Sequence, residues 1–192
     1  MCALIRIAAA LPFLALAAGG CGGDDDGGST DLEGIYELAS WTHNPDGCDQ
    51  PGPAAAEESF YTHLFVRADS FFGEEFVSAI MCDTLDECRT MAADEDTLYL
   101  GNFTFEEGSD DDGWTGRSFI LSVGDTCMGS VFEFVMTGNP HASVLINQET
   151  KTVTDVPVDD MGECVDQEAY DQAADLPCEE LTVVAGIFLE AI

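Results

Sequence analysis

The sequence predicts a mainly β domain, folded as an antiparallel up-and-down β-barrel or a β-sandwich, with one short helix near the C-terminus and with disulfide bonds. Three observations predict it. About eight to ten short segments alternate apolar and polar residues, and turn-forming residues separate them at regular spacing. One segment near the C-terminus has helical periodicity. Six cysteines are spread over the same region. Barrels and sandwiches both have this pattern, so both remain open.

The expected strands follow one another along the whole domain. Tyr36 and Leu38 share a face of the first strand, and the turn Asn44-Pro-Asp-Gly47 comes after it. Residues 82–95 are expected to form an acidic loop closed through Cys88, and turns are expected at 108–113, 137–140 and 148–149. The expected strands cover residues 34–41, 60–67, 75–82, 97–105, 114–123, 127–136, 143–146, 151–156 and 181–189.

The one expected helix covers residues 165–174. Val165, Ala169 and Ala173 are four residues apart, so they share a helix face, and acidic residues occupy the other face. Pro177 lies just beyond its end, as is common after a helix stops. In the last strand, every second residue is apolar: Leu181, Val183, Ala185, Ile187 and Leu189.

Residues 1–20 have the pattern of a secretory signal peptide. The cation Arg6 precedes an apolar run over 7–18, which is too short to cross a bilayer of about 30 Å, and small residues come before Cys21. The ending Leu16-Ala-Ala-Gly-Gly-Cys21 resembles the lipobox of bacterial lipoproteins, except that Ala18 stands where that motif has leucine. The resemblance implies that residues 1–20 are removed and that Cys21 is lipidated. An ordinary signal cut near Ala18 or Gly20, with Cys21 left free, is the alternative.

The resemblance also implies a location. Residues 21–31 would be a lipidated cysteine and a flexible acidic tether, since 22–30 (GGDDDGGST) cannot build a core. Residues 32–192 would form a single β domain. Two or more acyl chains give stable anchoring. The protein would therefore lie in the bacterial cell envelope, and Gly22 after Cys21 favours the outer membrane.

The charge of the chain limits its partners. It has 38 Asp and Glu against 5 Lys and Arg, a net charge of −33. Nucleic acid is excluded, because phosphate contacts need cations, and docking on anionic lipid is disfavoured. A solvated acidic surface explains the excess, and weak Ca²⁺ binding at residues 94–96, 110–112 or 159–160 is the alternative. None of these turns has the spacing of an EF-hand loop.

Six cysteines remain once Cys2 is removed with the signal peptide and Cys21 is lipidated. In an oxidising compartment an even number predicts three disulfides. A zinc site is disfavoured, because the chain has no Cys-x-x-Cys and no histidine at ligand spacing from a cysteine pair. The expected pairs are Cys82–Cys88, Cys164–Cys178 and Cys48–Cys127.

No pattern of catalytic residues stands out, which favours a non-enzymatic protein. His43, His63 and His141 have no local partner motif, and the chain has no Gly-x-Ser-x-Gly turn. No cofactor is predicted. The chain's carboxylates are too many for one acid–base pair to be singled out.

The start of the domain suggests what it binds. The segment Leu32-Glu-Gly-Ile-Tyr36, followed by Trp41, resembles the start of lipocalin-like barrels, with tyrosine in place of the tryptophan of their Gly-x-Trp. The resemblance implies a barrel that binds a small apolar molecule, and the other expected partner is an envelope protein. A structural surface lipoprotein that binds Ca²⁺ weakly is the alternative. The aromatic residues that would line a barrel cavity, or else fill a plain core, are Tyr99, Phe103, Phe105, Phe119, Phe132 and Phe134.

Overall fold

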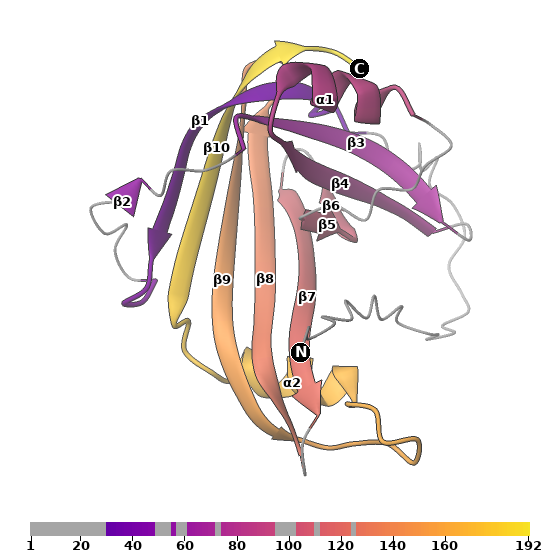
Figure 1. The fold of residues 1–192 in the computed structure, drawn as a ribbon, viewed down its shortest axis with the longest axis vertical. Helices are drawn as coiled ribbons and strands as arrows, with labels where there is room; N and C mark the ends of the chain where they lie inside the picture. The colour runs from indigo at the N-terminus through magenta and orange to yellow at the C-terminus, as the bar shows by residue number, and fades with distance from the viewer. Residues whose placement is uncertain are drawn as a thin grey trace, which may run out of the picture.

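A computed structural model describes residues 30–48, 55–56, 61–71, 74–94, 103–109, 112–123 and 126–192. The predicted signal peptide, Cys21 and residues 22–29 of the predicted tether lie outside these ranges. The described residues form one antiparallel sheet with a helix at each end of the molecule (Figure 1). None of the helices in these ranges is long and apolar enough to cross a membrane.

The sheet has ten strands, in the order β5-β4-β3-β1-β10-β9-β8-β7-β6, with β2 beside β1. Their bounds are β1 Gly34–Asn44, β2 Ala55–Ala56, β3 His63–Phe71, β4 Glu74–Cys82, β5 Phe103–Phe105, β6 Glu107–Ser109, β7 Gly113–Val123, β8 Cys127–Asn139, β9 Ser143–Val156 and β10 Glu180–Glu190. The two helices are α1, Leu85–Ala92, and α2, Asp166–Ala174. The mainly β prediction is confirmed.

The two ends of the sheet meet, so the fold is a nearly closed barrel and not a sandwich. β5 and β6 are the two end strands of the sheet, and they follow each other in the chain. Val77 of β4 pairs with Phe105 on one side of this segment, and Thr115 of β7 pairs with Glu107 on the other. Gly116 brings β7 so close that a Cβ atom there would overlap the carbonyl of Thr104. The barrel therefore closes on the segment 103–109.

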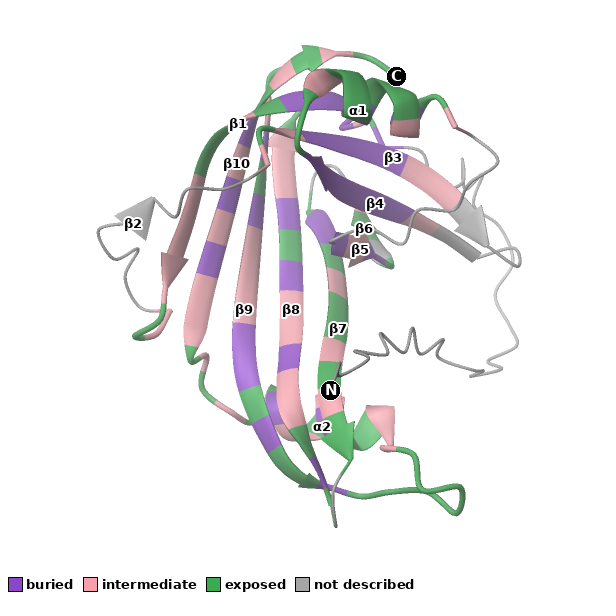
Figure 2. Ribbon diagram, viewed as in Figure 1, coloured by how far each residue is buried: buried purple, intermediate pink, exposed green. Residues whose placement is uncertain are grey.

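The core fills the closed half of the barrel. Tyr36 and Phe105 are fully buried, and the rings of Phe103 and Phe134 meet edge to face at 5.3 Å. Figure 2 shows how much of β3 and β4 is buried. The buried cluster on the inner face contains Leu32, Tyr36, Leu64, Val66, Val77, Ala79, Met81, Phe103, Phe105, Trp114, Phe134, Met136, Val144, Ile146 and Val184.

Residues before the first strand also belong to the packed domain. Leu32 is fully buried, and its carbonyl accepts a hydrogen bond from the Tyr36 hydroxyl at 2.6 Å. Thr30 is buried as well, and its Oγ1 accepts a hydrogen bond from the Leu32 N–H. Packed structure thus starts at least two residues before the predicted boundary at residue 32.

Helix α1 corrects the prediction of an acidic loop over 82–95. The side chain of Thr84 caps the helix by accepting a hydrogen bond from the Glu87 N–H. Thr84 and Glu87 have the Ser/Thr-x-x-Glu spacing of a capping box, which is the sequence signal of this helix start. Cys88 and Ala92 are buried against Phe65 and neighbouring residues on the outer face of β3 and β4.

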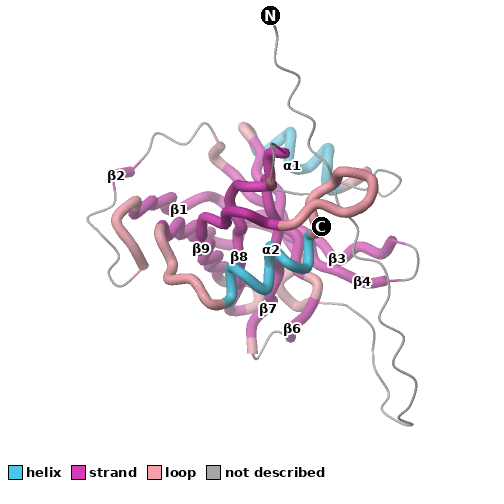
Figure 3. Tube along the Cα trace, turned by 90° about the horizontal axis from the view of Figure 1, so that it is seen from below, coloured by secondary structure: helices cyan, strands magenta, loops and turns pink. Residues whose placement is uncertain are grey.

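Helix α2 lies where the sequence predicts a helix. Ala169 and Ala173 are buried on the outer face of the sheet with Val131 of β8 and Val153 of β9. Seen from below, α2 crosses the near ends of the long strands (Figure 3). Tyr170 adds a second layer of contacts with β7, since its ring meets Phe119 at 5.6 Å and lies 4.2 Å from the Arg117 guanidinium.

We expect Tyr170 to make the protein sensitive to alkali. Burial raises the pKa of Tyr170 to about 12, and Glu106 and Asp166 add to this shift, which Arg117 opposes. A folded-state pKa above the ordinary value near 10 favours the protonated folded form, so this contribution is complete below pH 10 and disappears between about pH 10 and 12. Urea midpoints measured over this range should fall less for Tyr170→Phe than for wild type. If the urea midpoints of the two proteins fall equally with pH, Tyr170 is not the source of the sensitivity to alkali.

Several strand boundaries differ from the prediction, most clearly in β9 and β8. β9 runs unbroken through the expected turn at 148–149, because Gln148 pairs with Phe134 of β8 on one side and Thr182 of β10 on the other. β8 continues to Asn139, so the turn lies at 140–142 instead of 137–140. Residues 97–102 of the strand expected at 97–105 lie outside the described ranges, and 103–105 form β5.

The six cysteines form three disulfides, but only Cys82–Cys88 was paired correctly from the sequence. The expected pairs Cys164–Cys178 and Cys48–Cys127 are wrong, since the structure has Cys127–Cys164 and Cys48–Cys178. α2 packs across β8, so the segment before it passes the start of that strand. β10 pairs with the end of β1, so the residues flanking these two strands meet.

Candidate functional site

The described residues do not cover the inner face of the sheet along its whole length. β1, β10, β9, β8 and β7 extend well beyond the closed half (Figure 1). In these extensions, the inward side chains of neighbouring strands lie beside one another. Ile120 of β7 lies opposite Ser130 of β8 at one edge, and Thr182 of β10 lies opposite His43 of β1 at the other. We call this surface the open face. It consists of Trp41, His43, Ser118, Ile120, Met128, Ser130, Phe132, Gln148, Thr150, Thr152 and Thr182.

One side of the open face is apolar and accessible. The side chains of Ile120 and Met128 are 66% and 55% exposed, although they point to the same side of the sheet as the core. Phe132 lies between them and the core cluster, against which it packs. An apolar surface therefore runs from solvent into the barrel core.

The other side of the open face is polar and aromatic. The Nδ1 atom of His43 lies within hydrogen-bond distance of Thr182 Oγ1, at 3.1 Å, and its Nε2 is 4.0 Å from a carboxylate oxygen of Glu180. The ring of Trp41 stacks on Tyr61 with a centroid distance of 6.2 Å. This side can offer hydroxyl and imidazole groups beside an aromatic surface.

The open face contains no cation, because the cations of the described residues are all engaged elsewhere. Arg67 pairs with Asp69 at 3.0 Å, and Arg117 lies over the Tyr170 ring. Lys151 pairs with Glu133, and Arg89 with Glu190. Hydrogen bonds from Arg89 lower the pKa of Glu190. A phosphate or carboxylate ligand would thus find no positive side chain there.

The three histidines lie in different parts of the fold. His43 belongs to the open face, whereas His63 begins β3 and its Nδ1 lies 2.7 Å from Thr62 Oγ1. His141 lies in the turn between β8 and β9, and its ring contacts Phe188 at 5.0 Å. The structure does not bring these three side chains together.

The aromatic residues that would line a cavity or else fill a plain core separate into three groups. Phe103, Phe105 and Phe134 fill the core, and Phe132 reaches the open face. Phe119 lies on the outer face, against α2, so it neither lines a barrel cavity nor belongs to the inner core. Tyr99 lies outside the described ranges.

In one of the acidic turns proposed for Ca²⁺, a carboxylate oxygen is already occupied by hydrogen bonds from the backbone. Asp159 Oδ1 accepts hydrogen bonds from the N–H groups of Met161 and Glu163, both at 2.9 Å. Residues 95–96 and 110–111 of the other two turns lie outside the described ranges. Calcium binding therefore remains a prediction from the sequence.

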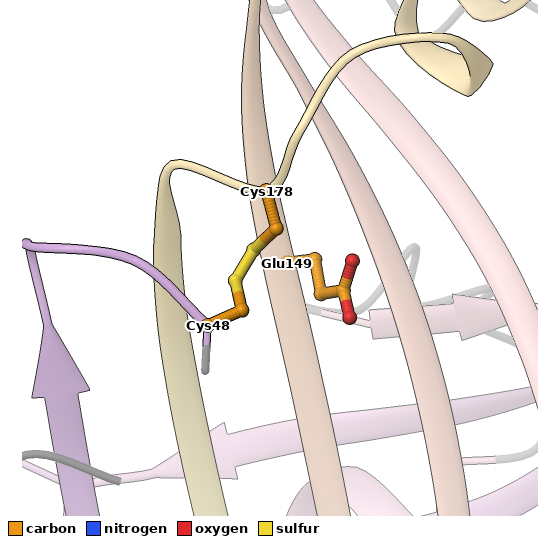
Figure 4. A group of neighbouring side chains, drawn as sticks. All are labelled: Cys48, Glu149 and Cys178. Atoms are coloured by element: carbon orange, nitrogen blue, oxygen red, sulfur yellow. A yellow bond between two sulfur atoms is a disulfide. The ribbon is translucent and has the colours of Figure 1, made fainter. Parts of the chain in front are cut away.

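A potential set of metal ligands was not expected from the sequence. Sulfur atoms of Cys48 and Cys178 and a carboxylate oxygen of Glu149 lie within 4.8 Å of one another (Figure 4). The two cysteines form a disulfide, however, and a disulfide lacks the thiolate charge that metal ions bind. This group is consequently a covalent link between β1 and β10, with a carboxylate beside it.

The described residues also line a shallow depression of about 210 Å³ at the closed end of the barrel. Its walls include Thr30, Asp31, Glu33, His141 and the C-terminal Ile192. Glu33 already accepts a hydrogen bond from the Ala68 N–H at 2.8 Å. The depression is small, polar and acidic, and it is separated from the open face by the core.

Comparison with known proteins gives no family for this chain. No protein-family model, no curated protein and no solved structure matches it. A function has therefore to come from the geometry and chemistry of the chain itself.

Proposed function

We propose that this chain is a lipid-anchored protein of the bacterial cell envelope whose β domain binds a small, mainly apolar molecule on the open face, without transforming it. The observation that carries this proposal is the exposure of Ile120 and Met128 on the core side of the sheet. Large exposed apolar surfaces on a folded domain mark binding sites. A ligand there would continue the apolar packing of Phe132.

The chemistry of the open face favours an uncharged ligand. An apolar part of the ligand would cover Ile120 and Met128, and a hydrogen-bonding part would reach the hydroxyl of Thr182 and the ring of His43. Glu180 lies close by, and the net charge of the chain is −33. These negative charges disfavour anionic amphiphiles such as fatty acid anions.

The position of the predicted anchor agrees with this site. The described domain begins at Thr30, where Leu32 lies close to Gly138 near the turn between β8 and β9. That turn is at the opposite end of β8 from Met128. A lipid on Cys21 would thus hold the closed end near the membrane and leave the open face accessible.

Binding of an uncharged probe tests the site. We expect the Cys21→Ala chain, otherwise complete and free of detergent, to bind N-phenyl-1-naphthylamine saturably, as measured by the fluorescence of the probe. Replacing both Ile120 and Met128 with serine should weaken binding about tenfold or more, because burying one large aliphatic side chain contributes about 1.5–3 kcal/mol.

A matched control separates the site from general stickiness. Met161→Ser removes an apolar side chain that is 80% exposed but lies in the loop before α2, outside the open face. This variant should bind the probe as the parent chain does. An equal loss in both variants, or no saturable binding by the parent, would reject the open face as the site.

The anchor has a test of its own. We expect the wild-type protein to fractionate with membranes and its N-terminal peptide to carry the mass of acyl chains on Cys21. The N-terminal peptide of Cys21→Ala should carry no acyl mass, because the sequence then lacks the acceptor thiol. Wild-type protein that is cut near Ala18 or Gly20 and carries no lipid would leave the ordinary signal peptide as the explanation.

A further inference from the structure

The outer face of the sheet carries a second apolar surface, on β8, β9 and β10. Ile187 is 54% exposed, and Leu145 and Val135 are exposed as well. Leu145 of β9 lies opposite Ala185 of β10, so the outward side chains of these two strands lie side by side. We call this surface the outer patch. It consists of Val135, Leu145, Val183, Ala185 and Ile187.

β10 has the composition of a strand that is covered on both sides. Its inner residue Val184 is buried in the core, and Phe188 packs against the same cluster. The regular apolar alternation noted in the sequence belongs, from Leu181 to Ile187, to its outer face. Strands that are apolar on both faces are typical of sheets with a layer packed on each side.

Helices already cover the outer face on both sides of the patch. α2 packs on Val131, four residues before Val135 in β8. α1 is tied to the end of β10 by the pair of hydrogen bonds from Arg89 to Glu190, next to Leu189. The outer patch is thus an area of this helix-binding face that no described helix covers.

The charges around the outer patch select its partner. Glu37 lies opposite Ile187 in the neighbouring strand, and Glu133 and Glu149 lie at the other side of the patch. Two cations lie beside Glu133: Lys151 pairs with it, and Arg117, opposite it in β7, lies over the Tyr170 ring. A second copy of this chain would bring another 33 net negative charges, whereas a basic partner would complement the rim.

We propose that the outer patch binds an amphipathic helix of a partner protein, with aliphatic side chains at its centre and Lys or Arg along its edges. This helix would complete the outer layer that α1 and α2 form on either side. The proposal does not depend on the function of the open face, because the two surfaces lie on opposite sides of the sheet.

Two synthetic peptides test it. One is an 18-residue amphipathic helix of Leu and Lys, and the matched peptide has Glu in place of Lys; both carry fluorescein. We expect the complete Cys21→Ala chain to bind the Leu/Lys peptide saturably by fluorescence anisotropy, and to bind the Leu/Glu peptide at least tenfold more weakly. Raising the salt concentration should weaken the first complex.

Two sets of variants separate docking from simple charge attraction. Replacing both Leu145 and Ile187 with serine leaves every charge in place and should weaken Leu/Lys binding at least tenfold. The double variant Glu37→Gln with Glu149→Gln should also weaken binding of the Leu/Lys peptide, because it removes negative charges beside the outer patch. It serves as the second test if the serine variant unfolds. The Ile120 and Met128 serine variant should bind the peptide as the parent does.

Four outcomes would overturn the proposal. Unchanged binding after both outer-patch substitutions would mean adsorption on an acidic surface, and equal binding of the Leu/Glu peptide would reject the basic rim. Concentration-dependent dimers that the serine variant abolishes, measured by light scattering, would assign the patch to a second copy. Binding to phosphatidylcholine vesicles that requires Ile187 and competes with the peptide would assign it to lipid.

Discussion

Replacing Gly116 with alanine should lower the free energy of unfolding by about 3 kcal/mol or more, because the barrel closes at this residue. A Cβ atom on Gly116 would overlap the carbonyl of Thr104, which belongs to the backbone of β5 and cannot turn aside as a flexible side chain can. β7 would have to move away from the segment 103–109. The pairing of Thr115 with Glu107 and the contacts of Trp114 in the core would be strained together.

Urea unfolding followed by tryptophan fluorescence measures this loss, with near-UV circular dichroism as the check on core packing. The matched control is Ser118→Ala, which changes an exposed residue two positions further along the same strand. We expect it to stay within about 0.5 kcal/mol of wild type. Similar midpoints for the two variants would mean that β7 and β5 are not as close as the structure has them.

Removing the disulfide between Cys48 and Cys178, by replacing both with serine, should cost about 4 kcal/mol. The bond joins residues 130 positions apart, so it restricts the unfolded chain strongly. The Cys127–Cys164 bond lies inside the loop from Cys48 to Cys178 and shortens it. The loss of stability is therefore somewhat smaller than for a loop of the same length without an internal disulfide. The loss should be seen as a lower urea midpoint under oxidising conditions.

The short Cys82–Cys88 bond is the internal comparison. It spans only 6 positions, and removing it with alanine at both sites should cost about 2 kcal/mol by loop entropy alone. Both of these sulfurs are buried, so a packing defect adds to that figure. A Cys48/Cys178 variant that unfolds at the same urea concentration as wild type would show that this bond contributes nothing to stability.

Local patterns in the sequence were sufficient for the fold class and most strands. Alternation located β1, β3, β4, β7 and β8 to within a few residues, and four-residue spacing of alanines located α2. Helix α1 was missed because its acidic residues resemble a solvated loop, although Thr84 and Glu87 carry the capping signal. β9 was divided at 148–149 because the run of polar residues from Asn147 to Thr152 resembles a turn, and only pairing on both sides keeps it extended.

The sites depend on information that no short segment contains. Which face of β10 is inside is decided by its register with β1 and β9, and the apolar alternation of Leu181 to Ile187 points outward. The exposure of Ile120 is decided by where the barrel closes, near Gly116, and not by its own neighbours. Disulfide pairing likewise follows from strand order, which is why the pairing of distant cysteines was wrong.

The engagement of the cations has a consequence for the survival of the protein among proteases. Trypsin-like enzymes cut after Lys or Arg, and apart from Arg6 the chain offers them four bonds. These bonds lie within β3, α1, β7 and β9, after Arg67, Arg89, Arg117 and Lys151. A protease needs an extended, unpaired segment, so each cut requires local unfolding first. Digestion of the native domain by such enzymes would therefore report how often its barrel opens.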